Sequence, residues 1–404
     1  MKQKSSTLAA VAIAAAFAFA GGLQAATITL TAPEDGATYD THSPCVKEFF
    51  ANFDKRGVKP ERPPEERDYF VFNEYTEDLL KRCTFKESPE WKPFTWETDG
   101  ELSDFTVEFS ETPDFAHSIV ENPGLWEKDG RGGAAIRPHF LKIGIKYFWR
   151  VKAKDAAGKE VVSKVRTFTT AGVPPRMIGV PGNNFRDLGG GTNADGVKIR
   201  QGLLYRGMQP FVNKPKEFVK NFYIDNLGIK TDLDIRGETE RAGAIEHGEA
   251  NLEEFGVKYF CYTMEDYHLY HDRCLQAFPK IMAILADRKN YPVYTHCMVG
   301  SDRTGTLFAV LDGILGRDDR YIYDDYELAS LAWWLPRFRY SRKGSELFGY
   351  LDPTSPKWGG PDPRWIPDPK VNGKNIRENA ELYLRAIGVP QEHIDAFRAI
   401  MLEK

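Results

Sequence analysis

The chain has 404 residues, of which 42% are hydrophobic, and it carries a formal net charge of −4. This length favours two domains, each able to bury a core. The weak negative charge gives no reason to expect nucleic acid or an anionic membrane surface as a partner. Its five cysteines are too few for a disulfide scaffold.

Residues 1–25 read as a secretory signal peptide. Two early lysines precede an uninterrupted apolar run at 8–20, and a pair of glycines and then Ala25 follow it. The run has 13 residues, whereas a helix that crosses a bilayer needs about 20. We therefore expect cleavage after Ala25, with Ala26 as the alternative, and no stable membrane insertion afterwards. The mature protein would be periplasmic or secreted.

Residues 26–171 read as a β-rich domain. Apolar and polar residues alternate at 105–110 and again at 147–154, the period of strands with one buried face. The segment 90–171 resembles the closing strands of fibronectin type III-like β-sandwiches. Such a domain would serve as a spacer, or it would bind a carbohydrate or protein ligand.

A charged, proline-containing stretch at about 46–92 does not fit the strand pattern, and we interpret it as an insertion into the first domain. It could overhang the active site of the second domain. Cys45 and Cys83 bracket it. In an oxidising compartment they would form a disulfide; the alternative is two free thiols.

A linker at 171–176 leads to a second domain over 172–404. Strand-like segments at 231–236 and 257–262 alternate with helical segments, including one at 214–227. This alternation predicts an α/β fold, in which helices flank a central sheet.

The most informative stretch is 293–306, Val-Tyr-Thr-His-Cys-Met-Val-Gly-Ser-Asp-Arg-Thr-Gly-Thr. It runs from an apolar strand through a loop between Cys297 and Arg303 into an apolar helix. A helix N-terminus and a neighbouring arginine stabilise a thiolate, which is a strong nucleophile. Five residues between Cys297 and Arg303 let backbone N–H groups curl into a nest for a tetrahedral anion. The pattern predicts thiolate attack on a phosphate ester.

Each loop residue then has an expected role. Arg303 would hold two phosphate oxygens, and Thr304 would hydrogen-bond the thiolate when it leaves. We assign His296 to orienting the loop rather than to acting as a base. The amides expected to bind the phosphate belong to Met298, Val299, Gly300 and Ser301. The loop lacks the Gly-Lys-Ser/Thr of a nucleotide-binding loop.

The motifs at 184–190 (Asn-Phe-Arg-Asp-Leu-Gly-Gly), 204–206 (Leu-Tyr-Arg), 232–236 and 296–305 together resemble the bacterial tyrosine/serine, dual-specificity-like protein phosphatase family of the protein tyrosine phosphatase superfamily. The resemblance covers roughly 178–404. It implies a central sheet of four or five strands with the cysteine at the end of one strand. It also implies phosphomonoesterase activity without a metal or another cofactor.

Two carboxyl groups compete for the role of general acid, which protonates the leaving oxygen. Asp266 precedes Cys297 by 31 positions, about where the superfamily carries its acid. Asp302 lies inside the loop, where the resembling family is suggested to use an aspartate. The resemblance also suggests that Arg186 and Asp187 brace the phosphate loop. Structural support is the expected role of Asp232, Asp234 and Arg236.

Many members of that family have lysine where this chain has Ser301, so a polyphosphorylated substrate is disfavoured. We interpret the basic residues at 337–343 as a solvated surface, with added charge near the site as the alternative. The aromatic stretch 333–336 reads as core. Cys261 or Cys274 could protect Cys297 as a disulfide partner; the alternative is that both are unreactive thiols.

Together these features predict an exported, cysteine-dependent phosphatase. Its substrate would be a phosphorylated protein or a small phosphate ester, with phosphotyrosine preferred and dual specificity open. The alternatives are an inositol-phosphate or phosphoinositide phosphatase, and a catalytically silent protein that binds phosphorylated ligands.

Overall fold

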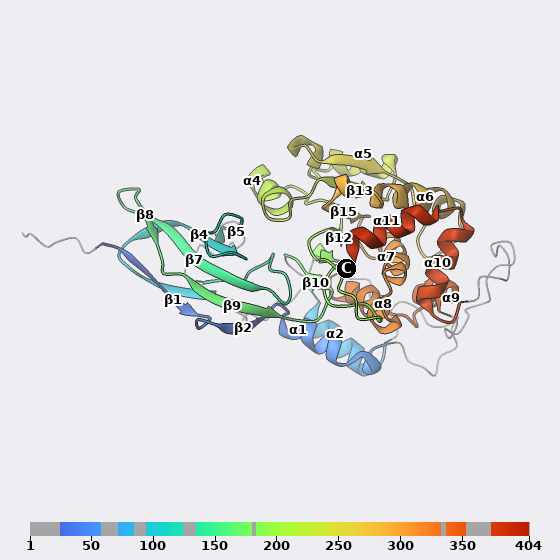
Figure 1. The fold of residues 1–404 in the computed structure, drawn as a ribbon, viewed down its shortest axis with the longest axis horizontal. Helices are drawn as coiled ribbons and strands as arrows, with labels where there is room; N and C mark the ends of the chain where they lie inside the picture. The colour runs from blue at the N-terminus through green and yellow to red at the C-terminus, as the bar shows by residue number, and fades with distance from the viewer. Residues whose placement is uncertain are drawn as a thin grey trace, which may run out of the picture.

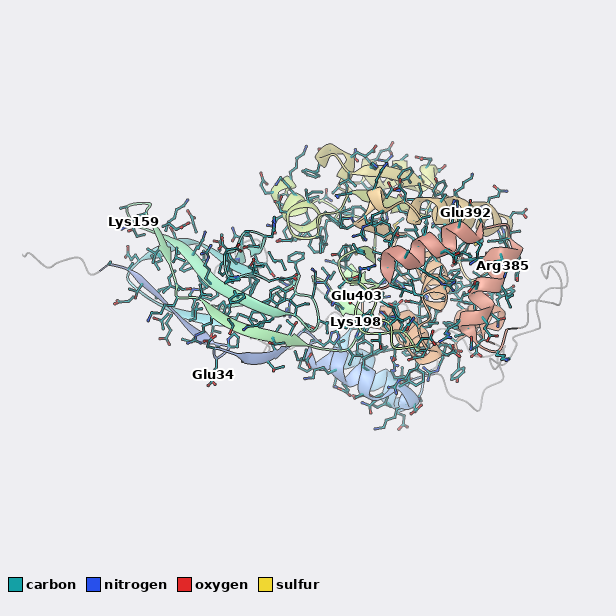
Figure 2. All side chains as sticks on the ribbon, viewed as in Figure 1. Glu34, Lys159, Lys198, Arg385, Glu392 and Glu403 are labelled. Atoms are coloured by element: carbon teal, nitrogen blue, oxygen red, sulfur yellow. A yellow bond between two sulfur atoms is a disulfide. The ribbon has the colours of Figure 1, made fainter. Side chains whose placement is uncertain are left out.

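The structure is a computed structural model that describes residues 25–57, 72–84, 94–123, 135–179, 183–332, 337–352 and 373–403. A β-rich domain lies at one end of the molecule and an α/β domain at the other (Figure 1). Nearly all of the predicted signal peptide falls outside the described residues. Within them, no helix is both long and apolar enough to cross a bilayer. The charged side chains of Glu34, Lys159, Arg385 and Glu392 are exposed on the exterior of the two domains (Figure 2).

In the described part of the N-terminal domain, two sheets enclose one core. The first has the order β1-β3-β6 and the second β2-β9-β7-β4-β5, with β8 on β7. The edge-to-face contact of Phe94 with Trp149, 4.9 Å between ring centroids, joins the two sheets. The strands are β1 (Thr27–Ala32), β2 (Ala37–Asp40), β3 (Phe94–Asp99), β4 (Leu102–Ser110), β5 (Ser118–Glu121), β6 (Ala135–Ile136), β7 (Lys146–Asp155), β8 (Glu160–Val162) and β9 (Arg166–Ala171).

The alternation predicted at 147–154 is confirmed, because every second residue of β7 is buried. This pattern lets β7 lie at the centre of its sheet with one face in the core. The fibronectin type III-like topology stays a prediction.

The described part of the insertion is helical, and it packs against the second domain. Helices α1 (Pro44–Ala51) and α2 (Glu74–Cys83), with the turn η1 (Phe53–Lys55), lie beside α8 of that domain (Figure 1). A disulfide joins Cys45 to Cys83, so the paired alternative is the one observed. Phe49 and Leu79 share a core cluster with Leu328 and Leu331.

The described residues of the second domain form a sheet in the order β10-β11-β12-β15-β13-β14, with β12, β15, β13 and β14 parallel. The sheet has six strands rather than the expected four or five, because the two-residue strands β10 and β11 extend one edge in antiparallel pairing. The strands are β10 (Arg176–Met177), β11 (Arg186–Asp187), β12 (Leu204–Gly207), β13 (Thr231–Asp234), β14 (Lys258–Cys261) and β15 (Val293–His296).

Helices cover both faces of this sheet, as predicted. Val293 packs with helices α6 to α11, whereas its neighbour Tyr294 packs with α4, η4 and η5, because successive strand residues face opposite sides. The helices are α4 (Lys216–Val219), η4 (Lys220–Asn226), α5 (Glu238–Glu246), η5 (Leu252–Phe255), α6 (Asp272–Leu285), η6 (Arg288–Asn290), α7 (Arg303–Ile314), α8 (Asp319–Leu328), η7 (Ala329–Leu331), α9 (Arg342–Leu351), α10 (Ile376–Ala386) and α11 (Gln391–Met401).

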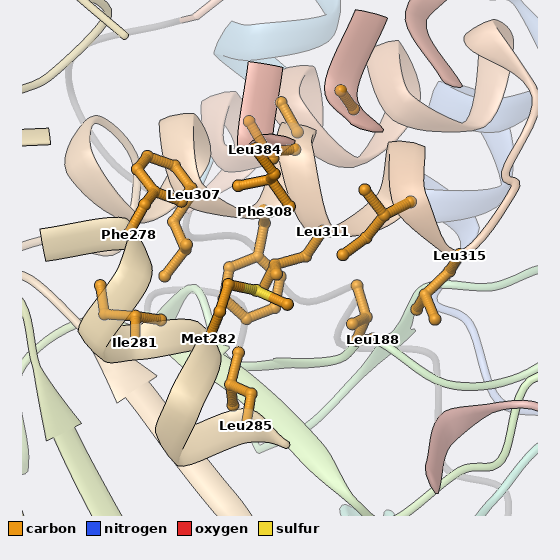
Figure 3. Packing of buried hydrophobic residues seen from close by; sticks show 14 of the residues in the cluster. Leu188, Phe278, Ile281, Met282, Leu285, Leu307, Phe308, Leu311, Leu315 and Leu384 are labelled. Carbon is orange, nitrogen blue, oxygen red and sulfur yellow. The ribbon is translucent and has the colours of Figure 1, made fainter. Parts of the chain in front are cut away.

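Helix α7 is the centre of the larger core. Leu307, Phe308 and Leu311 pack against Met282 of α6 and Leu384 of α10 (Figure 3). The helix is buried along almost its whole length. Its first turn, which begins at Arg303, is therefore held rigidly at the end of β15.

Candidate active site

The predicted phosphate loop joins β15 to α7 at the carboxyl edge of the parallel strands. Cys297 follows the last residue of β15 and is 3% exposed. Gly300 has φ +70°, and a Cβ atom there would collide with the backbone of Gly207. Only glycine combines this backbone conformation with so close an approach. The sequence therefore forms a tight loop with Cys297 at its base and Arg303 at its far side.

Groups outside the loop bind its carbonyl oxygens. The Met298 carbonyl accepts from the amide of Gln209 (3.1 Å), the Val299 carbonyl from Nδ2 of Asn184 (2.9 Å), and the Gly300 carbonyl from Nη2 of Arg206 (2.8 Å). In each trans peptide the N–H points away from its C=O. The next amides are therefore directed to the inside of the loop, which is the geometry of an anion-binding nest.

A buried charged cluster supports these contacts. Asp325 of α8 binds Arg206 and accepts from Nε of Arg186 at 2.8 Å, and Arg186 also donates to Asn184. Burial opposes ionisation of Asp325, but Arg186 and Arg206 lower its pKa below the ordinary value. Arg186 thus braces the loop through Asn184. Asp187 does not: it pairs with Arg176 at 2.8 Å and accepts from the amide of Gly202.

The guanidinium of Arg303 is fixed by a carboxylate. Its Nη1 and Nη2 lie 2.9 and 2.8 Å from the two oxygens of Glu240 on α5. Burial disfavours the charged form, but Glu240, Cys297 and Asp266 raise the pKa of Arg303. Cys297 and Asp266 therefore lie near enough to Arg303 for their charges to act on it.

Asp266 lies on the loop after β14, half-buried beside the site. Lys343 of α9 places its Nζ 3.3 Å from Oδ2 of Asp266. Burial and then the charge of Asp302 raise the pKa of Asp266 above its ordinary value. A carboxyl group that keeps its proton to higher pH suits the role of general acid.

Asp302, the other candidate acid, is held by an ion pair. Nε and Nη2 of Arg337 lie 2.5 and 3.0 Å from its two oxygens, and the Tyr267 hydroxyl donates to it as well. The amide of Tyr267 donates to the hydroxyl of Thr306 on α7 at 2.8 Å. Tyr267 therefore ties the loop that carries Asp266 to the start of α7.

His296 and Thr304 occupy supporting positions. Nε2 of the buried His296 lies 2.9 Å from Asp232, and its Nδ1 lies 3.2 Å from the carbonyl of Cys297. Burial alone would lower the pKa of His296, but the charges of Asp232 and Asp234 outweigh burial and raise the pKa above its ordinary value. Within the described part of the chain, the buried hydroxyl of Thr304 has no hydrogen-bond partner. It is available for a leaving thiolate, and His296 is placed to orient the loop.

The interpretation of 337–343 as a solvated surface is wrong. Arg337 and Arg339 are 2% and 4% exposed, and both pair with buried or half-buried carboxylates. Lys343 contacts Asp266. The side chain of Arg342, and the aromatic stretch 333–336 expected in the core, lie outside the described residues. Ser301 is buried and accepts from Asn184, so the loop gains no positive charge there.

The other free cysteines have poor thiolates. Burial raises the pKa of Cys274 to about 12 and that of Cys261 to about 11. Cys274 donates to the carbonyl of Glu265 at 3.3 Å. Neither Cys261 nor Cys274 is bonded to Cys297 in the structure, which matches the alternative that Cys261 and Cys274 are unreactive thiols.

Several residues of the site were missed by reasoning from sequence. Glu240, Tyr267 and Asp325 carry no motif of their own, because their roles depend on partners that are distant in the chain. Arg206 stands in the Leu-Tyr-Arg motif, which was a usable signal. The position of Arg206 on β12, parallel to β15, could have placed it beside the loop.

Comparisons with known proteins identify several phosphatases to which this chain is similar. A model of the tyrosine phosphatase family matches residues 180–403. The putative tyrosine-protein phosphatase OCA1 of Meyerozyma guilliermondii is 24% identical over 151 residues, which are 37% of this chain and 74% of that protein. Two solved structures of the Siw14 catalytic core, one of them described as a PP-IP phosphatase from S. cerevisiae in complex with citrate, are each 20% identical. They cover 37% and 46% of this chain and 82% and 96% of their own, with TM-scores of 0.25 and 0.27.

The family model spans more than half of the chain and includes the whole phosphate loop. The chain belongs to the tyrosine phosphatase family, and it is a phosphoric monoester hydrolase.

Proposed function

We propose that the protein is an exported phosphatase that hydrolyses phosphotyrosine-type monoesters through a phosphocysteine intermediate. The observation that carries the proposal is the loop itself. Cys297 lies at its base, Arg303 begins α7 at its far end, and the loop carbonyls are bound from outside, so that the amides turn inward. These groups would bind the three equatorial oxygens of a transferring phosphoryl group.

The reaction then runs in two displacements. The Cys297 thiolate forms a bond to phosphorus while the ester oxygen leaves, and Asp266 gives that oxygen its proton. A water molecule next attacks the phosphocysteine, and Asp266, now ionised, accepts a proton from it. The sulfur leaves as a thiolate toward the hydroxyl of Thr304. We choose Asp266 over Asp302 because Arg337 binds both oxygens of Asp302.

Two features support export. The insertion is closed by a disulfide between Cys45 and Cys83, and structural disulfides persist in oxidising compartments. The predicted signal peptide would direct the chain there.

An inositol-phosphate phosphatase is the second candidate, since Lys343 and Arg337 lie at the site. Each of these cations faces a carboxylate, however, and Ser301 adds no charge. The charge of the site therefore suits a phosphotyrosine-type ester better than a polyphosphate.

The test is turnover of p-nitrophenyl phosphate, a phosphotyrosine peptide and phytate, with a chelator present and Cys297 kept reduced. Cys297→Ser should abolish turnover, whereas the matched thiol variant Cys261→Ser should retain it. Higher kcat/KM on phytate than on the peptide would favour the second candidate. Phosphate or vanadate binding by the wild type without turnover of any ester would favour a silent binding protein.

A further inference from the structure

The segment 337–339 connects the phosphate loop to the insertion of the first domain. On one side, Arg337 donates from Nε and Nη2 to Asp302 at 2.5 and 3.0 Å and from Nε to the Tyr267 hydroxyl at 2.9 Å. Asp302 precedes Arg303, and Tyr267 follows Asp266. Arg337 thus fixes two positions directly adjacent to catalytic groups.

The next two residues contact the insertion. The ring of Phe338, fully buried, lies 5.3 Å from the ring of Phe72 in an edge-to-face contact. Arg339 donates from Nη2 to the carbonyl of Phe53 at 3.1 Å, and its guanidinium lies 3.8 Å from the centroid of the Phe53 ring. The insertion therefore packs directly against this buried segment.

A buried charge network also holds the insertion against α8. Arg56 pairs with Asp324 and lies 3.5 Å from Glu327, both on α8, while Glu327 also binds Arg339 at 2.8 Å. The Arg56 guanidinium lies 3.6 Å from the centroid of the Phe49 ring. Buried ions of this kind tolerate little displacement, because each loses its partner when it moves.

The disulfide closes this arrangement. It joins α1, which carries Phe49, to the last residue of α2, so both ends of the insertion are fastened together. The two helices lie beside α8 (Figure 1). The 337–339 segment gives the insertion a direct connection to Asp302 and Tyr267.

We propose that the insertion is a positioning element of the active site: through Phe72, Arg56 and the disulfide, it holds Arg337 against Asp302 and Tyr267. This inference rests on the proposed function. Displacing the insertion releases Arg337, and the loop that carries the general acid then loses its anchor. Opening the disulfide has the same consequence, although Cys297 itself requires a free thiol. Reductant therefore favours activity by keeping the Cys297 thiol free, and it lowers activity by opening the disulfide between Cys45 and Cys83.

The first test uses Phe72→Ala, with Phe72→Leu as the conservative variant and Glu74→Gln, an exposed position on α2, as the matched control. Misplacing an acid lowers kcat most for substrates whose leaving group needs a proton. We expect Phe72→Ala to lower kcat on a phosphotyrosine peptide about tenfold, with a much smaller fall on p-nitrophenyl phosphate and little change in KM. Phe72→Leu should recover most of the loss.

The second test opens the bridge. Wild type is assayed with the disulfide intact and after reduction, with thiols counted in both states, beside Cys45→Ser/Cys83→Ser. Reduction should lower the ratio of peptide to p-nitrophenyl phosphate turnover to the value of the double variant, which should not respond to reductant. Thermal unfolding of every variant shows whether it is folded at the assay temperature.

Equal losses on both substrates by folded Phe72→Ala, or a ratio that does not change once the bridge is open, would overturn this inference and leave the proposed function intact. A wild type that hydrolyses neither substrate while Cys297 titrates as a free thiol would instead refute the proposed function.

Discussion

Replacing Asp302 and Asp266 in turn by asparagine should separate a stability role from a catalytic one. Asp302→Asn removes the charge that Arg337 binds at 2.5 and 3.0 Å. The side chains of Arg337 and Asp302 are 2% and 21% exposed. Breaking a fully buried pair costs about 3–5 kcal/mol. Because Asp302 is partly solvated and asparagine keeps one acceptor oxygen, we expect a loss of about 2 kcal/mol, a fall in Tm of about 4–8 °C.

Asp266→Asn should behave in the opposite way. The side chains of Asp266 and Lys343 are 29% and 30% exposed, so loss of their ion pair should cost less than about 1 kcal/mol. Removal of a general acid lowers turnover about 10²–10⁴-fold on a phosphotyrosine peptide. The effect should be much smaller on p-nitrophenyl phosphate, whose leaving group needs little protonation.

The pH profile gives an independent reading. Burial and the charge of Asp302 raise the pKa of Asp266, so the acid form persists above the ordinary range and activity should fall as pH rises through the raised value. Asp266→Asn should remove that falling limb. Measurements of Tm, of kcat on both substrates and of the pH profile for both variants decide which aspartate is the general acid. A thermally stable Asp302→Asn that loses peptide turnover, beside a fully active Asp266→Asn, would refute the reasoning.

Three further substitutions test other contacts. Gly300→Ala places a side chain at φ +70° against the neighbouring backbone, so it should abolish phosphate binding by isothermal titration; wild-type affinity would contradict this. Glu240→Gln frees the guanidinium of Arg303, and kcat/KM should fall about tenfold from lost orientation with Tm nearly unchanged; unchanged kinetics would mean that the pair is incidental. The pKa of His296 is raised, because the charges of Asp232 and Asp234 outweigh the effect of burial. The contribution of protonated His296 to the free energy of unfolding should be full below pH 6.5 and lost as pH rises through the raised pKa. Denaturant unfolding curves of Asp232→Asn should lack this pH dependence.

The phosphate loop was predictable because its information is local. The cysteine, Gly300 and Arg303 lie within one strand–loop–helix unit, and their chemistry follows from spacing. The buried face of β7 was predictable for the same reason, since alternation along a strand reports directly on its two faces. Both features depend on residues that are near neighbours in the chain.

The failures share another cause. A sequence shows that Arg337 and Arg339 are charged, but it does not show that they pair with Asp302 and Glu327 in the fold. A buried network of ion pairs is therefore interpreted as a solvated surface. The docking of the insertion against α8 depends on contacts such as Phe72 with Phe338, far apart in the chain. The two extra edge strands are two residues each, too short to show a period.

The most direct test of the central claim is to trap the phosphoenzyme. Rapid quenching of wild type during turnover of a phosphotyrosine peptide, followed by peptide mass analysis, should find one phosphoryl group on the peptide that contains Cys297, and Asp266→Asn should accumulate less of it per unit time. Steady turnover without a phosphorylated Cys297, or turnover that survives Cys297→Ser, would contradict the account.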